Sequence, residues 1–350
     1  MASHLIFVGT YTRTTSRGIY STRLDADTGQ LSAPVVAAET VSPTFLAFSP
    51  DQRRLYAVLD SKDMAVAYAV NADSAGLDRI SGPPSADVPA PCHVAVDRTG
   101  RALVVANYHS AEVAALPILA DGSIGVPNVL THSGSSVHPT RQTASHPHST
   151  TISPDNRFVI VCDLGLDRIF TYRFDPAAAT LSPAEPAFVA ATPGAGPRHF
   201  AFGKDGLHAY AINELGNTVV AYAYDSGTGA LVPFQTLSTL PANFSGQSIA
   251  AEVRVHPNGR FLYGSNRGHD SIAVFGIDPA SGRLTPVEIV PAGGKAPRNF
   301  ALTADGKWLV CAHQDSNSLC AFRVNPDTGR LTRVPGSIPV PMPVCVLVYD

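Results

Sequence analysis

One unit recurs about every fifty residues along the chain, and this repeat limits the possible folds more than any other feature of the sequence. Each copy contains a short apolar strand, a tight polar turn and a second apolar strand. The copies are PTFLAFSPDQRRLYAVLD from Pro43, PCHVAVDRTGRALVVANY from Pro91, PHSTTISPDNRFVIVCDL from Pro147, PRHFAFGKDGLHAYAINEL from Pro197, AEVRVHPNGRFLYGSNRG from Ala251 and PRNFALTADGKWLVCAHQD from Pro297. Their turns are rich in Asp, Asn and Gly, which adopt the backbone angles that tight hairpins require.

A second kind of turn alternates with the first and follows strands such as IAVFGI and VVAYAY. It reads DADTGQL at Asp25, NADSAGL at Asn71, DPAAATL at Asp175, DSGTGAL at Asp225, DPASGRL at Asp278 and NPDTGRL at Asn325, with a weaker form, ILADGSIG, near Asp121. Each unit therefore has four strands and two hairpin turns at one end. Seven such units fill the 350 residues, which predicts an all-β, seven-bladed β-propeller of four-stranded blades.

The two ends of the chain supply incomplete units that complement each other. The N-terminal segments HLIFVGTYT and GIYSTRLDAD resemble a second and a third strand with no first strand before them. The C-terminal segment PVCVLVYD resembles a first strand with nothing after it. We expect one blade built from three N-terminal strands and one C-terminal strand, because their pairing removes the open sheet edges and closes the ring.

Length and charge are consistent with one ring. A chain of 350 residues often has two domains, but repetition around an axis lets one domain grow without one ever-larger core, so we expect a single domain over residues 1–350. The net charge of −3 argues against nucleic acid or an anionic membrane as a partner. No apolar run approaches the length of a membrane span.

Cysteine usage and the N-terminus indicate a cytoplasmic protein. The start, MASHLIFVGTYT, has neither the basic region nor the small-residue cleavage site of a secretory signal. The five cysteines are odd in number, form no CxxC pair and lie mostly in apolar strands. We interpret them as buried thiols in a reducing compartment.

The two faces of such a ring differ in sequence. Both repeated turns fall on one face, and we attribute their similarity to turn geometry alone. The other face carries polar links that vary from blade to blade, which is typical of a functional site on a rigid scaffold. The links between blades bring to the start of the inner strands His93, His146, His148, Arg198, His199, Glu252, Arg298 and Asn299. The links between second and third strands bring Tyr11, Asp60, Asn107, Tyr108, Asp163, Glu214, Asn266, Arg267, Gln314 and Asp315.

The histidines and Arg198 each have two interpretations. His146 and His148 form an HxH pair that can indicate a metal, but no acidic third ligand accompanies them at a recognisable spacing, so we expect no metal and a catalytic or substrate-binding role for at least one. Arg198, at the start of an inner strand, either forms an inter-blade salt bridge or binds an anion or oxyanion with its planar fork.

Glu214 and Arg267 lie in the links AINELGNT and SNRGHDS. A carboxylate at the end of an apolar strand is partly desolvated, which predicts a raised pKa and acid–base work for Glu214; the alternative is an ion pair with Arg198 or Arg267. We interpret Arg267 as an anion-binding residue and Asp270 as a residue that fixes the loop.

The chain contains no G-x-S-x-G elbow, no phosphate-binding G-x-x-x-x-G-K-[ST] loop, no H-E-x-x-H and no dinucleotide fingerprint. Histidine, glutamate and arginine chemistry on a polar, anionic small molecule remains, with no cofactor.

Several stretches resemble the propeller lactonase family, which includes the bacterial propeller-type 6-phosphogluconolactonases and the fungal 3-carboxy-cis,cis-muconate lactonizing enzymes. They are RQTASHPHS, GPRHFAF, NEL, AAEVRVHPNGRFLYGSNRGHDSIAVF and PRNFALTADGKWL. The resemblance implies a seven-bladed propeller that acts on a lactone or its open acid without a metal. By motif, the catalytic histidine, glutamate and two arginines proposed for the fungal branch fall on His148, Glu214, Arg198 and Arg267. Ser145 departs from the family, which more often has proline there.

The resemblance leads to a hypothesis of lactone hydrolysis. Water attacks the ring carbonyl while neutral His148 or ionised Glu214 accepts its proton, and Arg198 stabilises the oxyanion. Arg267, with Arg141 or His199, holds the phosphate or carboxylate of the substrate. The full set of expected substrate-binding residues is His146, His199, Arg141, Tyr108, Asn266 and Arg298.

We expect an anionic sugar lactone such as 6-phosphogluconolactone as the substrate, and a monomer or weak homo-oligomer. Two alternatives stay open: a carboxymuconate cycloisomerase, and a non-enzymatic propeller that binds a partner. A propeller of the second kind usually has a G-H and a W-D signature in each blade, whereas this chain has one tryptophan, Trp308.

Overall fold

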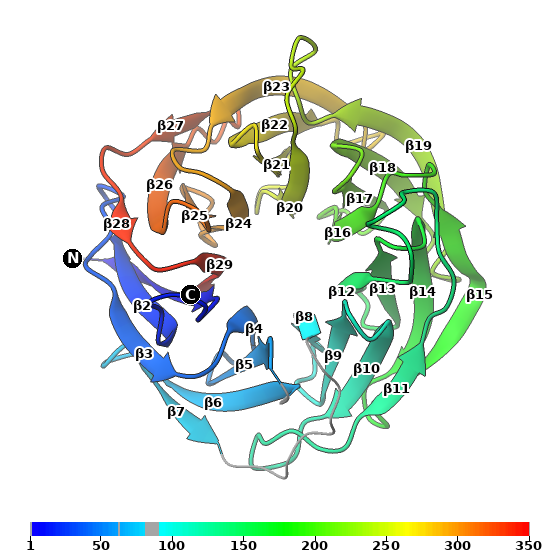
Figure 1. Cartoon of the computed structure of the whole chain (residues 1–350), viewed down its shortest axis with the longest axis horizontal. Helices are drawn as coiled ribbons and strands as arrows, with labels where there is room; N and C mark the ends of the chain where they lie inside the picture. The colour runs from blue at the N-terminus through cyan, green and yellow to red at the C-terminus, as the bar shows by residue number, and fades with distance from the viewer. Residues whose placement is uncertain (1, 62–63, 81–90, 350) are drawn as a thin grey trace.

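The computed structural model describes residues 2–61, 64–80 and 91–349. Seven antiparallel sheets stand around a central axis like the blades of a propeller, which confirms the predicted fold (Figure 1). In the described part of the chain every regular element is a strand. None of it forms a helix long and apolar enough to cross a membrane.

The strands of each blade run outward from the axis in chain order. The blades that follow the closing blade are β4 (Pro43–Phe48), β5 (Arg54–Leu59), β6 (Ala65–Asn71) and β7 (Gly76–Ile80); β8 (Pro91–Val96), β9 (Ala102–Asn107), β10 (Glu112–Pro117) and β11 (Asn128–Thr131); and β12 (Pro147–Ile152), β13 (Phe158–Asp163), β14 (Arg168–Asp175) and β15 (Thr180–Ala190). The next are β16 (Pro197–Phe202), β17 (His208–Asn213), β18 (Thr218–Tyr224) and β19 (Leu231–Ser238); β20 (Ile249–Val255), β21 (Phe261–Arg267), β22 (Ser271–Ile277) and β23 (Leu284–Pro291); and β24 (Pro297–Leu302), β25 (Trp308–His313), β26 (Ser318–Val324) and β27 (Leu331–Arg333), with β28 (Ile338–Pro339) also paired to β26.

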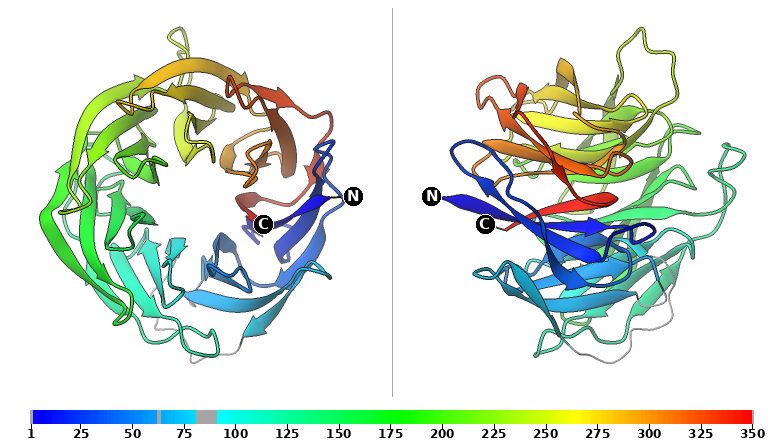
Figure 2. Two further views of the ribbon diagram at one scale, coloured as in Figure 1. Left: turned by 180° about the vertical axis from the view of Figure 1, so that it is seen from behind. Right: turned by 60° about the vertical axis from the view of Figure 1, so that its left-hand side comes forward.

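The closing blade combines both ends of the chain, as predicted. Its order is β29 (Pro343–Tyr349), β1 (Ser3–Thr10), β2 (Gly18–Asp25) and β3 (Val35–Glu39). Strand β1 pairs with β29 from Leu5 opposite Tyr349 to Gly9 opposite Cys345. The two termini therefore lie close together in the ring (Figures 1 and 2).

The hydrophobic core lies between neighbouring blades. The second strands β9, β13 and β25 are buried at every residue, because both faces of each sheet pack against an adjacent sheet. One such layer joins Phe158 and Ile160 of β13 to Ala209 and Ala211 of β17. This burial explains why the second strands are almost continuously apolar instead of alternating.

The repeated turns also hold neighbouring blades together. The hydroxyls of Tyr56, Tyr210 and Tyr263 donate to the carbonyls of Gly122, Gly282 and Gly329 in the outer turn of the following blade, at 3.2, 2.9 and 2.9 Å. The explanation by turn geometry alone was therefore wrong, because contact with the preceding blade also constrains these turns.

The same contact joins the last blade to the first. The Trp308 indole donates to the Ala26 carbonyl at 3.0 Å. Gly29 has a φ of +73°, and a Cβ there would lie 2.3 Å from the Trp308 ring. Glycine at this turn therefore serves both the backbone conformation and the contact between blades.

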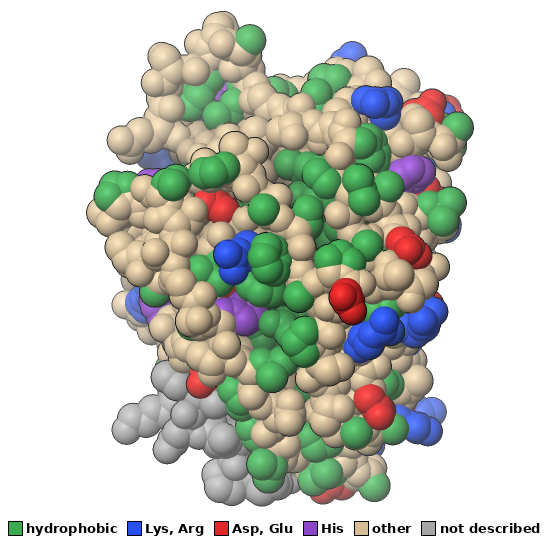
Figure 3. All heavy atoms as spheres, turned by 90° about the vertical axis from the view of Figure 1, so that its right-hand side faces the viewer, with side chains coloured by type: hydrophobic (Ala, Val, Ile, Leu, Met, Phe, Trp, Pro, Cys, Tyr) green, Lys and Arg blue, Asp and Glu red, His purple; other side chains and the backbone are tan. Residues whose placement is uncertain are grey.

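The outer rim shows no dominant sign of charge in the view of Figure 3, where acidic and basic side chains are scattered among polar and apolar ones. All five cysteines are free thiols; four are buried, and Cys92 is partly buried beside the central channel.

Candidate active site

In six of the seven blades, a bulge near the start of the inner strand directs one side chain toward the axis. In β12 the register shifts between Pro147 and Ser149, so His148 has no partner residue on β13. Equivalent shifts occur in five other inner strands, and the residues that they leave over are Thr44, Cys92, Arg198, Arg298 and Val344. A bulge is a common way to re-aim a side chain beside an active site. These six residues are named the bulge ring below, and all of them line the channel.

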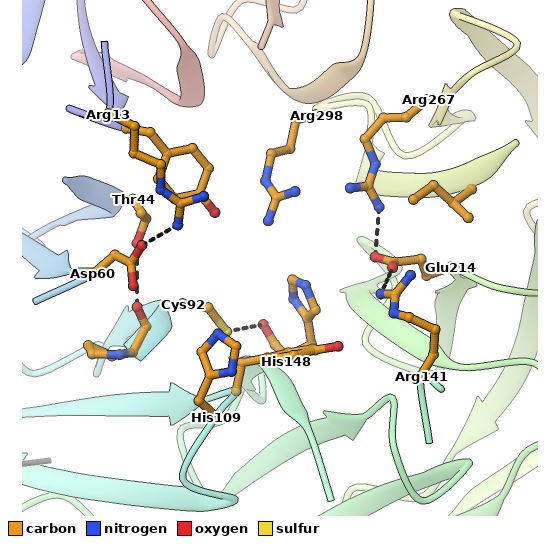
Figure 4. Close-up of a pocket in the computed structure, with 14 residues that line it drawn as sticks. Arg13, Thr44, Asp60, Cys92, His109, Arg141, His148, Glu214, Arg267 and Arg298 are labelled. Atoms are coloured by element: carbon orange, nitrogen blue, oxygen red, sulfur yellow. Dashed lines mark hydrogen bonds and ion pairs between the residues drawn. The ribbon is translucent and has the colours of Figure 1, made fainter. Parts of the chain in front are cut away.

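The channel opens on this face into a cavity of about 310 Å³, here called the upper pocket (Figure 4). Its wall is formed by Tyr11, Arg13, Thr44, Asp60, Pro91, Cys92, Tyr108, His109, Arg141, His148, Glu214, Ile249, Arg267 and Arg298. The size suits a small molecule, and the arginines make the pocket cationic.

Three arginines converge on Glu214, whose side chain is only 2% exposed. Two of them bind the same oxygen: Arg198 Nε lies 2.9 Å from Glu214 Oε2, and a guanidinium nitrogen of Arg267 lies 2.7 Å from it. Arg141 forms an ion pair with the other oxygen, Oε1. Burial raises the pKa of Glu214, but these cations lower it more strongly, and the net pKa lies well below its usual range. The predicted raised pKa is therefore wrong, and the ion-pair alternative is correct.

Arg198 does not reach the upper pocket. It is 2% exposed, and besides the ion pair with Glu214 it donates to the Ala251 carbonyl at 2.7 Å. It borders a narrow space of about 20 Å³ beneath the upper pocket, here called the neck. This position does not support Arg198 as an oxyanion donor in the upper pocket and assigns it to the floor.

Arg298 is different, because its guanidinium makes no hydrogen bond or ion pair with the described residues. It points into the upper pocket in Figure 4, and its guanidinium lies 5.8 Å from the centre of the Tyr11 ring. Arg13, at the rim, is in contrast bound to Asp60 at 2.6 Å. Arg298 is therefore a cation of the upper pocket that still needs an anion.

His148 is the buried imidazole of the pocket, whereas His109 lies exposed at its wall. His148 is 5% exposed, and its Nδ1 is buried without a hydrogen-bond partner. Burial, together with Arg198, His199 and Arg298, holds the pKa of His148 well below its ordinary value. The ring is therefore neutral at physiological pH and free to accept a proton.

His146 lies behind the pocket wall instead of in it. Its ring stacks on Tyr108 with centroids 4.3 Å apart, and its Nδ1 donates to the Tyr108 carbonyl at 2.8 Å. Tyr108 does line the pocket and contacts His148 edge-on at 5.6 Å. The structure supports a positioning role for His146, and among the described residues no cluster of three or more His, Cys, Asp or Glu could hold a metal ion.

Two other expected binding residues are also absent from the upper pocket. Asn266 is fully buried, accepts from Thr239 at 2.6 Å and donates to the Thr239 carbonyl at 2.8 Å, so it fixes a loop. His199 lies deeper in the channel, with its Nδ1 3.1 Å from Glu252. The substrate-binding prediction is therefore not supported for either residue, whereas Arg141, Tyr108 and Arg298 do line the pocket.

The sequence reasoning missed how the turn DLGLD between β13 and β14 organises the site. Asp163 accepts from His132 at 2.7 Å, from Ser145 at 2.6 Å and from the His146 backbone at 2.8 Å. Asp167 accepts from Ser136 at 2.6 Å and from the backbone of Gly194 and Gly196 at 2.7 Å each. These two carboxylates anchor the loops that deliver Arg141, His148 and Arg198. Two aspartates closely spaced after an apolar strand were the available signal.

The fold and the site together define a β-propeller with a cationic pocket on the face that carries the variable polar links, and with a neutral histidine at the floor of that pocket. The seven-bladed β-propeller lactonase family model matches residues 5–348, so the chain belongs to the lactonase family.

Individual relatives agree with this assignment. The chain is 37% identical over 349 residues to the 6-phosphogluconolactonase of Bacillus subtilis (strain 168), covering 99% of this chain and 98% of that one. It is 32% identical over 289 residues to a 6-phosphogluconolactonase of Serratia proteamaculans, covering 81% and 80%. Among solved structures, the periplasmic gluconolactonase of Pseudomonas aeruginosa superposes with a TM-score of 0.94 at 36% identity, covering 100% and 99%.

Proposed function

We propose that this protein hydrolyses an anionic sugar lactone to its open-chain acid, with His148 as the general base. The observation that carries the proposal is a buried, unpartnered and neutral imidazole at the floor of a pocket that also contains the unpaired guanidinium of Arg298. A relative at 37% identity is named 6-phosphogluconolactonase, which supports a phosphorylated sugar lactone as the substrate.

In the proposed reaction a water molecule adds to the ring carbonyl while His148 accepts its proton. Arg267 stabilises the negative charge that develops on the carbonyl oxygen, because it lines the pocket and its Nε has no partner. The tetrahedral intermediate then expels the ring oxygen, which takes the proton back from His148. The new carboxylic acid then ionises in the pocket by giving its proton to His148, and a hydroxycarboxylate leaves.

Glu214 acts through the arginines in this mechanism instead of through proton transfer. Its ionised carboxylate holds Arg141 and Arg267 in place and keeps their guanidinium planes directed at the pocket. Both of its carboxylate oxygens are occupied by guanidinium groups, so Glu214 is not free to accept a proton from water.

Arg298 binds the anionic group of the substrate. Arg141 and Arg267 are already paired with Glu214, so their charge is partly compensated, whereas the charge of Arg298 is not. A guanidinium that forms charge-assisted hydrogen bonds to a phosphate or carboxylate contributes about 1.5–3 kcal/mol.

The test is a substrate panel combined with two variants. The panel contains 6-phosphogluconolactone, unphosphorylated gluconolactone and galactonolactone, and muconolactones. We expect the fastest hydrolysis with the phosphorylated lactone, and His148→Gln should lower kcat by about 10²–10⁴-fold while the fold persists. Arg298→Met should raise KM for the phosphorylated lactone by about 10- to 100-fold and leave neutral lactones nearly unchanged.

Each arm of the panel can refute part of the proposal. Faster turnover of a neutral lactone would assign Arg298 to structure instead of to substrate binding. If formation or opening of a muconolactone were the main activity, the protein would be a cycloisomerase and not a sugar lactone hydrolase. Full activity of His148→Gln would show that His148 is not the general base.

We also propose a cytoplasmic location, because the described cysteines are all free thiols. One structural relative is named a periplasmic gluconolactonase, so cell fractionation has to decide. Recovery with periplasmic markers would overturn this proposal.

A further inference from the structure

The central channel does not end at the floor of the upper pocket. Below the neck it widens again into a second cavity of about 390 Å³, here called the lower cavity. Its wall is formed by the inner strands of six blades, with apolar residues such as Val94, Ile152 and Leu347 along its length. His148 borders the upper pocket and the neck, and His199 borders the neck and the lower cavity.

Three neighbouring imidazoles, here called the column, connect the upper pocket to the lower cavity: His148 borders the upper pocket, and both His199 and His93 border the lower cavity. The ring centroids of His148 and His199 are 5.4 Å apart, and those of His199 and His93 are 5.3 Å apart. Among the described residues no hydrogen bond joins these rings directly, and His148 Nδ1 has no partner, so water molecules are needed to connect their nitrogen atoms. The neck, with about 20 Å³, has room for about one water molecule.

We infer that this column of histidines is a rear path for water and protons, which supplies the hydrolytic water to His148 and removes the proton that hydrolysis releases. The inference rests on the proposed lactone hydrolysis and adds positioning and relay residues to it. His199 is the relay, and His93 is its outlet toward the lower cavity.

Lactone hydrolysis involves both species that such a path would carry, water and a proton. Hydrolysis converts a lactone and one water into a hydroxycarboxylate and one proton, so each turnover consumes a water and releases a proton. A substrate that fills the upper pocket lies between His148 and the solvent on that face. The lower cavity leads to the same imidazole from behind through His199 and the neck, and its wall includes the half-exposed side chain of Arg254.

The groups around the column keep the imidazoles neutral. His199 Nδ1 lies 3.1 Å from Glu252 Oε1, and Arg254 Nε lies 3.2 Å from the same oxygen. Burial, together with Arg198 and Arg254, lowers the pKa of His199 to about 4, against the opposing effect of Glu252. Burial and His199 likewise lower the pKa of His93, whose Nδ1 lies 3.3 Å from Thr150 Oγ1.

A neutral imidazole can accept a proton at one nitrogen and release another from the second nitrogen. Because a proton is not held on any of these rings, it passes on quickly to the next water instead of remaining in the channel. His199 Nε2 makes no hydrogen bond with the described residues, so a water in the neck can reach it.

The experiment compares His199→Gln and His199→Ala with the unmodified protein. Glutamine keeps a donor for Glu252 but cannot relay a proton, and alanine leaves space for a small molecule. We expect kcat to fall at least about tenfold in dilute buffer for both variants, with KM unchanged, because His199 does not line the upper pocket. Added imidazole should restore kcat of His199→Ala, and the solvent deuterium isotope effect on kcat should rise.

A matched control is His256→Gln. His256 is also buried, but its Nε2 binds the Gly306 carbonyl at 2.8 Å, outside the three cavities of the channel. This variant should change the melting temperature and leave kcat unaffected. Thermal melting of both His199 variants shows whether the fold persists.

Unchanged kcat in both His199 variants, in dilute as well as in concentrated buffer, would overturn the rear path. The same result would leave the proposed function intact if His148→Gln were inactive. A loss of kcat in His199→Ala that imidazole does not restore would assign His199 a structural role only.

Discussion

The Glu214→Gln substitution separates two roles that a carboxylate in this pocket can have. Glu214 is 2% exposed and is the common partner of Arg141, Arg198 and Arg267, of which Arg198 is equally buried. Glutamine has nearly the same shape but no charge. The substitution therefore leaves two buried guanidinium groups without a counter-ion.

The expected loss of stability follows from this burial. Breaking a buried ion pair by removing one partner costs about 3–5 kcal/mol. An entropy of unfolding of about 2.1 cal/mol/K per residue gives about 0.7 kcal/mol/K for 350 residues, so the melting temperature should fall by about 4–7 °C.

Differential scanning calorimetry and steady-state kinetics on the same preparation give both readouts. We expect the lower melting temperature together with a raised KM, because Arg141 and Arg267 lose their alignment. The matched control is Asp155→Asn, in the turn on the opposite face, where Asp155 accepts from Ser153 at 2.6 Å. It should affect stability slightly and kinetics not at all.

An unchanged melting temperature with a fall in kcat of more than about 100-fold and no change in KM would refute this reasoning. Such a result would mean that Glu214 transfers protons. If Asp155→Asn strongly lowered turnover while the His148 and Glu214 variants left it unchanged, the active site would instead lie on the other face.

Further predictions concern closure, metal, positioning and pH. Removal of residues 341–350 exposes the edge of β1, so the truncated chain should be insoluble or have a much lower melting temperature, which expression and melting tests will measure. A soluble truncated chain with an unchanged melting temperature would contradict the role of β29 in closing the ring. Turnover should survive prolonged dialysis against a chelator, and restoration of lost activity by one divalent ion would refute this. Asp167→Asn should lower kcat and shift its pH profile, since Asp167 anchors the segments on either side of the site; unchanged kinetics would make it dispensable. Folding lowers the pKa values of three histidines, His93, His148 and His199, so the stability that they contribute is present above about pH 6.5 and is lost as the pH falls toward about 4. Denaturant titrations at several pH values will measure this loss. An equal free energy of unfolding at pH 7 and pH 5 would contradict the prediction.

Much of the fold could be read from the repeats. Alternating apolar segments and two families of turns predicted the blades and their number, and the unmatched ends predicted the closing blade. These features are local, because hairpin geometry depends on neighbouring residues. The contact of Trp308 with the turn at Ala26 could not be read in the same way, since it joins residues 282 positions apart.

The candidate site could be predicted in part. His148, Arg141, Arg267, Glu214 and Arg298 do meet in one pocket. The state of Glu214 was predicted wrongly, because local burial alone raises the pKa of a carboxyl. The opposing cations come from positions 16, 53 and 73 residues away, and only the ring brings them to one carboxylate.

The sequence by itself determined that six inner strands begin with proline followed by one variable residue: Thr44, Cys92, His148, Arg198, Arg298 or Val344. It could not show which side chain at the start of each inner strand points toward the axis. The tertiary structure decided this, because the bulge after each proline turns the side chain inward, and closure of the ring brings the six positions to the same channel. Strand patterns are encoded locally, whereas electrostatics at the axis sums contributions from every blade.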